Sequence, residues 1–495
     1  MQIKLSEVLN LLKKGEFYQA RAICEKILEK EDKNSEVYNL HAFTLYFDKK
    51  FDKAIISWQK AIDINPKYIE AFNGLGNAYI KLKKMEHAIQ SFEKAIKINP
   101  NYFEAYSNLG SALLKLKKYK DAIVKFEEAI KIKPDFSEAI YGKAYSLMRD
   151  KNFQDAIIFF KKFIELNPQS ANAYNALGSC LISLSMFEES LNYLTKALNI
   201  QPDHKDALEN LMNLLKFYQP KKNYSNQMII INEKIRSNDF KFNSKLHIQD
   251  ENIISYYNKI YEILKKNLPF NNFNEEQIFR RNRLILNCRR HFKVFNTYNI
   301  IPEYCFGCYK IQINLKNVLE LFKLYFIFDN LKLDGNNIRK TMIETRPKIA
   351  GTYKGLIYCS GLNEAKKVLD IVYPIVRSNI DKKIILFIKR GCTEFNLLYP
   401  NFEKIDQSVK YKSDWKDKEI EIDKHYIFDV DTSFKNSISG MNINDALIMK
   451  NWLSYAKKID DLSYKRFSLD IPHNEYIEDK LFNQIVFRKK EFLKN

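Results

Sequence analysis

The stretch AYSNLGSALLKLKKYKDAIVKFEEAIKIKP, residues 105–134, decides the fold of the N-terminal half of this 495-residue chain. It ends at a proline, and a proline returns at the same place in the neighbouring stretches, always thirty-four residues apart. A fixed period of this length predicts an array of stacked helix pairs, in which the proline ends the second helix of each pair. The five prolines are Pro66, Pro100, Pro134, Pro168 and Pro202.

Small and aromatic residues keep the same period. Small residues let two antiparallel helices approach closely, and the large residue fills the gap between one unit and the next. The small positions are Ala42, Gly76, Gly110, Ala144 and Gly178, followed by Ala54, Ala88, Ala122, Ala156 and Ser190. The large positions are Trp58, Phe92, Phe126, Phe160 and Leu194.

This pattern resembles the tetratricopeptide repeat family, and residues 105–134 look like a near-consensus unit. The resemblance covers somewhat under half of the chain and implies an α solenoid, a superhelix of about six units with a capping helix, over residues 1–218. A weaker first unit carries Cys24 at the aromatic position and Asp32 in place of the proline. Such arrays bind other polypeptides along a concave face, which implies an adaptor or scaffold with a protein or peptide partner. The alternative is that the repeat array is only a spacer and binds no partner.

In this family the first helix of each unit lines the groove, and this geometry implies which residues face a partner. An acidic row would be Glu36, Glu70, Glu104 and Glu138, and a basic row Lys81, Lys115 and Arg149. The same charges would also complement the helix dipoles without any partner. The candidate partner-binding residues are Glu36, Asn73, Asn77, Lys81, Asn108, Lys115, Tyr145 and Arg149.

Some family members grip a peptide backbone with a ladder of asparagines at the sixth position of each unit. Only Asn108 and Asn210 match that position here. Asn39, Asn73 and Asn175 fall one residue earlier, and we expect them to point elsewhere.

Composition limits the remaining possibilities. There are 80 basic and 60 acidic residues, a formal net charge of +20, which admits nucleic acid as a less favoured partner. No apolar run reaches the ~18 residues of a membrane span. The N-terminus lacks the apolar core of a signal peptide, so a cytoplasmic, reducing location is expected. Structural disulfides are then not expected among the seven cysteines.

The second half divides differently. Residues 219–285 predict a linker and connector helices at about 250–267 and 275–285. We expect residues 286–410 to form a cysteine-bearing α/β domain, and residues 411–495 to form a C-terminal α/β extension. From Tyr309 the order strand, helix, strand, strand, helix, strand indicates a ferredoxin-like βαββαβ domain, with Pro374 ending or kinking its second helix.

A cysteine cluster in this domain predicts a metal site. Cys288-x-x-His291 precedes Cys305-x-x-Cys308, and paired ligands of this spacing suit tetrahedral zinc or an iron–sulfur cluster. In the predicted sheet Cys392 lies beside Cys308, whereas Cys359 is expected at the opposite edge. Two ligand sets are possible for this site: four thiolates, or three thiolates together with His291. Inert buried thiols and a redox pair are the alternatives.

Enzymatic motifs are mostly missing. The chain has no Walker loop, no Gly-x-Gly-x-x-Gly and no Gly-x-Ser-x-Gly. Asp429 and Asp431 could share a divalent cation, and repeats of this kind resemble those that precede protein O-glycosyltransferase domains, so a glycosyltransferase-like enzyme is one alternative. RNA binding by the basic and aromatic run from Arg280 to Tyr298 is another.

Overall fold

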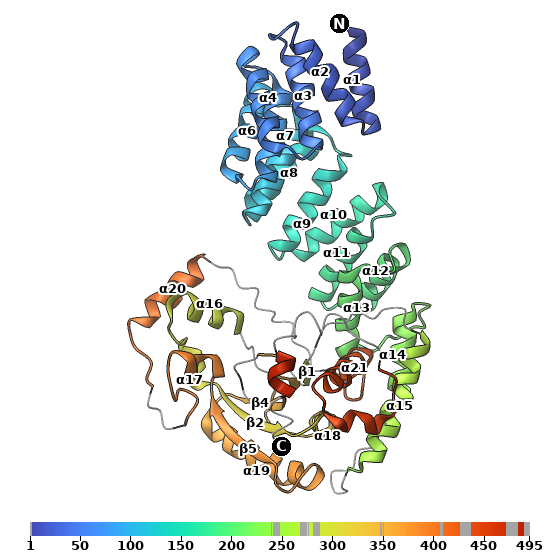
Figure 1. Cartoon of the computed structure of the whole chain (residues 1–495), viewed down its shortest axis with the longest axis vertical. Coiled ribbons are helices and arrows are strands. Elements are labelled where there is room, and N and C mark those ends of the chain that lie inside the picture. The colour runs from blue at the N-terminus through green and yellow to red at the C-terminus, as the bar shows by residue number, and fades with distance from the viewer. Residues whose placement is uncertain are drawn as a thin grey trace. The chain divides into compact units, whose positions relative to one another are not determined.

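A computed structural model shows two compact units, Met1–Asn210 and Leu211–Asn495 (Figure 1). None of the described helices has the length and apolar composition that crossing a membrane requires. The structure describes residues 2–238, 240, 248–267, 275, 277–280, 288–346, 349, 351–405, 409–425, 437–471 and 484–489.

The first unit consists of helix pairs, as the period predicts. Each of the five periodic prolines stands two residues beyond the last residue of a second helix, which confirms their role as terminators. The helices are α1 (Gln2–Lys14), α2 (Phe17–Leu28), α3 (Ser35–Phe47), α4 (Phe51–Ile64), α5 (Ile69–Lys81), α6 (Met85–Ile98), α7 (Phe103–Lys115), α8 (Tyr119–Ile132), α9 (Ser137–Arg149), α10 (Phe153–Leu166), α11 (Ala171–Ser183) and α12 (Phe187–Ile200). The next helix, α13 (Lys205–Phe217), begins in the first unit and ends in the second.

Large side chains from second helices fill the space between pairs. The Phe126 ring of α8 is buried between two glycines, and a Cβ atom added to Gly142 would stand 2.4 Å from that ring. Trp58 of α4 packs in the same way against Gly74 of α5. The small residues are therefore required because the ring of a neighbouring helix occupies the space of a side chain.

The second unit contains one antiparallel sheet with helices against it. The strand order is β1-β3-β4-β2-β5, and every pair of neighbours is antiparallel. The strands are β1 (Gln277–Arg280), β2 (Tyr309–Leu315), β3 (Arg339–Ile343), β4 (Tyr353–Cys359) and β5 (Ile385–Arg390). The helices are α14 (Gln227–Ser237), α15 (Asp250–Asn267), α16 (Cys288–Tyr298), α17 (Glu303–Gly307), α18 (Val318–Asn330), α19 (Leu362–Asn379), α20 (Trp415–His425) and α21 (Ile443–Lys458), with 3-10 turns at η1 (Thr393–Leu397) and η2 (Leu462–Phe467).

One face of this sheet packs on α18 and α19. A Cβ atom at Gly355 of β4 would meet the Leu324 side chain of α18 at 2.2 Å, so the glycine allows the helix to lie directly on the strand. Since α18 contacts four of the strands and also contacts α19, the two helices cover the same face. Side chains at alternate positions, among them Lys310, therefore lie on the other face.

One expectation about this unit is wrong, and one of the two alternatives for Pro374 is excluded. Residues 277–280 form the edge strand β1 and not part of a helix, because Ile278 and Arg280 alternate inward while Phe279 faces out. Pro374 lies inside α19 and does not end it. This proline is exposed, so the carbonyl group that loses its hydrogen bond can bind water instead.

A cluster of charged side chains is buried in the second unit. The Arg280 guanidinium is 2.8 Å from Asp329 Oδ1 and 2.5 Å from Asp445 Oδ2. The Tyr325 hydroxyl also donates to Asp445, over 3.1 Å. This cluster ties the edge strand β1 to α18 and to the start of α21.

Candidate functional site

The eight predicted partner-binding residues lie on the first helices of their pairs, α3, α5, α7 and α9. Half of them are exposed and the other half are half-buried, so all eight are accessible. The glutamates lie in the first turn of these helices and the cations in the last turn. The two rows therefore run along opposite ends of the helices, where they also complement the helix dipoles.

Two asparagine pairs bridge neighbouring units. Asn108 Nδ2 donates to Asn73 Oδ1 over 2.8 Å, and Asn210 Nδ2 donates to Asn175 Oδ1 over 2.9 Å. The expectation that Asn73 and Asn175 point away from Asn108 and Asn210 is therefore wrong. The fifth position of one unit therefore lies beside the sixth position of the next unit. The spacing of residues along a single helix does not reveal this neighbourhood.

Asn39 does point elsewhere, as expected. It is buried, its Oδ1 accepts from Trp58 Nε1 over 2.9 Å, and its Nδ2 donates to the Tyr68 hydroxyl over 3.2 Å. Its role is to satisfy the indole nitrogen of a core side chain.

The second unit gathers the five predicted metal-ligating residues around one small cavity, here called the thiol cavity. Gly391 N donates to Cys308 O over 2.7 Å, which places the end of β5, and with it Cys392, beside the start of β2. Among the described residues, no three His, Cys, Asp or Glu side chains are arranged to hold a metal ion. The cavity is lined by Cys288, His291, Cys305, Cys308, Lys310 and Cys392, with aromatic side chains and Gly391 around them.

A buried carboxylate holds two walls of the thiol cavity together. Glu419 of α20 accepts from Arg290 Nη1 of α16 and from the backbone nitrogen of Glu303 at the start of α17, both over 2.8 Å. Arg290 also pairs with Asp423 over 2.7 Å. Because α16 carries Cys288 and His291 and α17 carries Cys305, this carboxylate fixes the distance between the donor groups.

A buried lysine faces the thiols. Lys310 Nζ is 3.1 Å from Cys392 Sγ and 5.1 Å from the centre of the Tyr358 ring. Burial lowers the pKa of Lys310, but the neighbouring Cys392, Tyr358 and Cys308 together raise it above its ordinary value.

Three thiols and the histidine that line the cavity are uncharged at neutral pH. Burial raises the pKa of Cys288 to about 11 and also raises the pKa of Cys305 and of Cys308. Burial and the Arg290 charge lower the pKa of His291 to about 4, and its ring stacks on Tyr304 with 5.1 Å between the centres. The His291 imidazole is therefore uncharged, which is the form that binds metal ions.

Lys310 and Glu419 were not predicted from the sequence. Lys310 follows Cys308 by two residues along an extended segment, so strand alternation could have placed it on the same side as the thiol. No pattern in the sequence around Glu419 identifies it, because its partner on α16 is more than a hundred residues away along the chain.

Cys359 is not at the opposite edge of the sheet. It pairs with Tyr309 in the register of β2 and β4, so it lies at the same end as Cys308. The third strand of this arrangement runs antiparallel to the first, and its last residue therefore meets the first strand's start.

The predicted RNA-binding run is also placed differently. Arg280 is buried between carboxylates, and Arg290 is engaged by Glu419 and Asp423, so neither guanidinium presents a free cation to a phosphate. Arg281 and Arg283 lie outside the described residues, as do Asp429 and Asp431 of the proposed cation pair.

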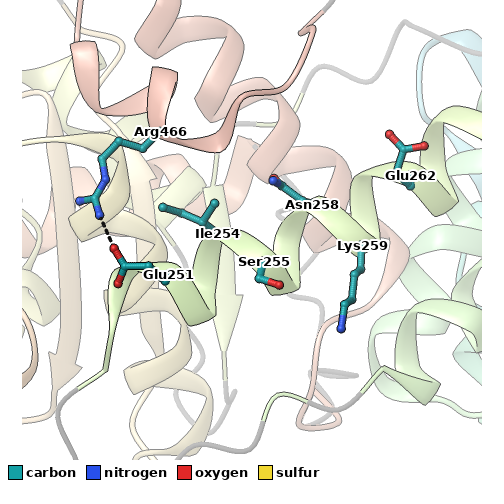
Figure 2. A pocket seen from close by; sticks show the side chains of 7 residues that line it. All are labelled: Glu251, Ile254, Ser255, Asn258, Lys259, Glu262 and Arg466. Atoms are coloured by element: carbon teal, nitrogen blue, oxygen red, sulfur yellow. Dashed lines mark hydrogen bonds and ion pairs between the residues drawn. The ribbon is translucent and has the colours of Figure 1, made fainter.

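A shallow hollow lies along α15. Figure 2 shows its lining, in which Arg466 Nη2 reaches Glu251 Oε1 over 3.0 Å. The remaining lining side chains, apart from Ile254, are polar residues of the same helix. This surface has no convergent donor set.

Two family models match the first unit. One describes the TPR repeat and matches residues 45–83 and 76–117, and the other describes the tetratricopeptide repeat and matches residues 103–136. Residues 45–136 are tetratricopeptide repeats. A third model, of the coatomer epsilon subunit, matches residues 146–253.

Several solved structures are similar to part of the chain. YrrB, a TPR protein with an unusual peptide-binding site, is 26% identical with a TM-score of 0.34, over 38% of this chain and 96% of its own. PilW, a type IV pilus biogenesis factor, is 22% identical with a TM-score of 0.40, over 42% and 97%. PilF of Pseudomonas aeruginosa is 18% identical with a TM-score of 0.40, over 43% and 96%. No curated protein matches the chain.

Proposed function

We propose that this protein is an adaptor, in which the TPR array binds an extended segment of a partner protein while the second unit carries a separate role. The observation that supports it is the accessible surface of α3, α5, α7 and α9, with glutamates along one end and Lys81, Lys115 and Arg149 along the other. Two rows of opposite charge would orient a segment that carries complementary charges.

The asparagine pairs add directional groups to this surface. Asn73 and Asn108 bind each other through one amide hydrogen bond, so each retains further donor or acceptor capacity for a peptide backbone. Asn77 and Tyr145 lie half-buried between the two charged rows and would contact side chains of the bound segment.

The test begins with a photo-reactive residue in place of Asn77 to identify the bound segment. The affinity of that segment is then measured for Lys81→Glu with Lys115→Glu. We expect the double substitution to weaken binding at least tenfold, with a loss that shrinks as salt is added, because it reverses two charges of the basic row.

The matched control reverses two exposed lysines of the second helices, Lys53→Glu with Lys97→Glu, and should leave the affinity within about twofold. Equal losses in the two double variants would show that net charge matters and the groove does not.

For the second unit, we infer a ferredoxin-like arrangement of β2, α18, β3, β4, α19 and β5. The strand order β3-β4-β2-β5 with antiparallel neighbours supports it. In this arrangement β1 is an added edge strand beside β3.

A further inference from the structure

Two adjoining cavities lie beside the C-terminal end of α18 in the second unit. The inner cavity has a volume of about 150 Å³ and the outer cavity a volume of about 390 Å³. Asp329, Asn330 and Ser439 line both, so they form the inner and outer compartments of one cleft, here called the α18 cleft. Among the described residues, the α18 cleft shares no lining residue with the thiol cavity.

Three aromatic side chains form one wall of the inner compartment. The Phe240 and Phe326 ring centres are 4.3 Å apart, and the Tyr256 ring centre lies 5.3 Å from that of Phe240 and 5.5 Å from that of Phe326. The Tyr256 hydroxyl donates to Asn238 O over 2.8 Å, so the wall is held in place before any ligand binds. Aromatic walls stack on planar rings, and a cavity of roughly 150 Å³ has room for a ring such as benzene.

Hydrogen bonds fix the segment that completes the inner compartment. Gly440 N donates to Asp329 Oδ2 over 2.7 Å, and Arg236 Nη1 donates to Ser439 O over 3.3 Å. These bonds tie the segment before α21 to α18 and to α14. A cavity with a fixed frame favours binding, because little of the protein has to be ordered when a ligand enters.

Two carboxamides with unused hydrogen-bonding capacity line the inner compartment. Asn330 Nδ2 donates to Phe326 O over 3.0 Å, and Asn238 Nδ2 donates to Lys234 O over 2.8 Å. Within the described part of the chain, neither amide oxygen accepts a hydrogen bond. Each side chain therefore offers an acceptor and one further N–H donor, which is the pair of groups that binds the polar edge of a heteroaromatic base.

The charges around the inner compartment are balanced. Arg236 lines it, and Arg280 is 2.8 Å from Asp329 Oδ1 and also pairs with Asp445. Two guanidinium groups thus face two carboxylates. An ion would add an uncompensated charge to this buried group, so an uncharged ring is the better occupant.

The outer compartment is polar and exposed. Lys332 and Asp334 line it, and neither has an ion-pair partner in the part of the chain that the structure describes. Arg339 Nη1 donates to Phe328 O over 2.7 Å and to Leu331 O over 2.6 Å, which holds the segment that carries them. A carboxylate can accept hydrogen bonds from the hydroxyl groups of a ribose. The compartment also tolerates a phosphate, since Lys332 and Arg339 outnumber Asp334.

We propose that the α18 cleft binds a nucleoside, with the base in the inner compartment and the ribose in the outer one. The base lies against the three rings with its polar edge on Asn238 and Asn330, and Asp334 accepts from the ribose hydroxyls. In a nucleotide, the phosphate lies near Lys332. All of these residues belong to the second unit, so the proposal does not depend on the array binding a partner.

The experiment titrates the purified full-length chain with adenosine, adenosine monophosphate, ribose phosphate and dideoxyadenosine by isothermal titration calorimetry. We expect one site per chain. Adenosine monophosphate should bind at least about fivefold more tightly than ribose phosphate, which has no base to stack on the aromatic wall. Adenosine should bind at least about fivefold more tightly than dideoxyadenosine, which lacks the hydroxyls that Asp334 accepts from.

Two pairs of variants separate the cleft from general damage to the fold. Asp334→Ala should weaken adenosine binding at least about fivefold and remove most of its advantage over dideoxyadenosine, whereas Asp370→Ala of α19 should change the affinity by less than about twofold. Lys332→Met should weaken adenosine monophosphate but not adenosine, and Lys367→Met of α19 should weaken neither. All four side chains are exposed, so we expect each variant to fold.

Saturation-transfer NMR of the unmodified chain tests the orientation without any substitution. The base protons of adenosine should receive more saturation than the ribose protons, because the base is the part that contacts the aromatic wall.

Four outcomes would overturn the proposal. The first is no saturable binding of adenosine or its monophosphate at millimolar concentrations. The second is equal affinity for adenosine monophosphate and ribose phosphate, which would indicate an oxyanion site. The third is an equal loss in Asp334→Ala and Asp370→Ala, and the fourth is stronger saturation of the ribose protons than of the base protons.

Discussion

The two units of this chain are built from different interactions. Among the described residues of the first unit, no Asp, Glu, Lys or Arg side chain is buried, and its core is formed by alanines, leucines and large rings. The second unit, by contrast, buries charged groups, among them Arg280, Arg339, Glu344, Lys354 and Asp445. A repeat array needs only apolar contacts between successive helices, whereas the α/β unit relies on specific polar partners.

The sequence separation of these contacts differs in the same way. In the first unit α7 packs on α8, and α8 on α9. In the second unit, Arg280 and Asp445 are 165 residues apart along the chain. A local pattern can therefore specify the first unit, but the second depends on pairs that only the complete fold brings together.

The substitution with the largest expected effect on stability removes a buried carboxylate of the second unit. Asp445→Ala would leave the buried Arg280 guanidinium with one carboxylate fewer and would also remove the capping box at the start of α21. We expect the free energy of unfolding of the second unit to fall by about 3–5 kcal/mol, with the first unit unaffected. Hydrogen exchange in increasing urea, followed by mass spectrometry, measures both units in one sample.

Asp423→Ala is the control for this substitution. Asp423 also binds an arginine, but its side chain is 48% exposed, so we expect a loss below about 1 kcal/mol. A similar loss in both variants would mean that burial does not set the value of the ion pair, and the contrast between the units would fail.

The same contrast explains how much of each unit the sequence predicts. The helix pairs of the first unit followed from the prolines and from the small and large positions, because each repeat meets its neighbours at fixed spacing. In the second unit β2, β4 and α18 were predicted, since their apolar patterns are long. β1 was not, because its four residues end in Arg280, whose inward direction makes sense only beside Asp329 and Asp445.

The thiol cavity shows the same division. Its five Cys and His residues were predicted from their spacing and from the order of the strands, and the structure does bring them together. Glu419, which spaces α16 from α17, was not found because its partners lie more than a hundred residues away. Donor residues can be recognised by chemistry, but the groups that position them are set by tertiary contacts.

A substitution in the first unit tests whether close packing alone maintains the array. At Gly142→Ala the added Cβ would stand 2.4 Å from the Phe126 ring. Overpacking of this kind costs about 1–3 kcal/mol, while alanine gains about 1 kcal/mol of helix propensity, so we expect a net loss of up to about 2 kcal/mol. Chemical denaturation monitored by circular dichroism, together with hydrogen exchange of α8 and α9, measures this loss.

Two further variants sharpen this test. Gly110→Ala places the new Cβ 3.0 Å from the same ring, so the two effects should nearly cancel and stability should change by less than about 1 kcal/mol. Phe126→Leu in the Gly142→Ala background should recover part of the loss, because a smaller side chain leaves room for the methyl group. If Phe126→Leu is equally harmful with and without Gly142→Ala, the ring does not explain the glycine.

The smallest expected effect concerns the polar contacts of the array. Asn73 and Asn108 are half-buried, so water can replace the hydrogen bond that Asn108→Ala removes. We expect Asn108→Ala to lower the free energy of unfolding by about 0.5–1 kcal/mol, and a double-mutant cycle with Asn73→Ala to give a coupling energy of similar size.

The corresponding cycle of Arg280→Met and Asp445→Ala in the second unit should give a coupling energy severalfold larger, because those groups are fully desolvated. Equal couplings in the two cycles would mean that polar contacts stabilise both units alike. Asn73 and Asn108 would then be structural residues of the array and not groups available to a partner.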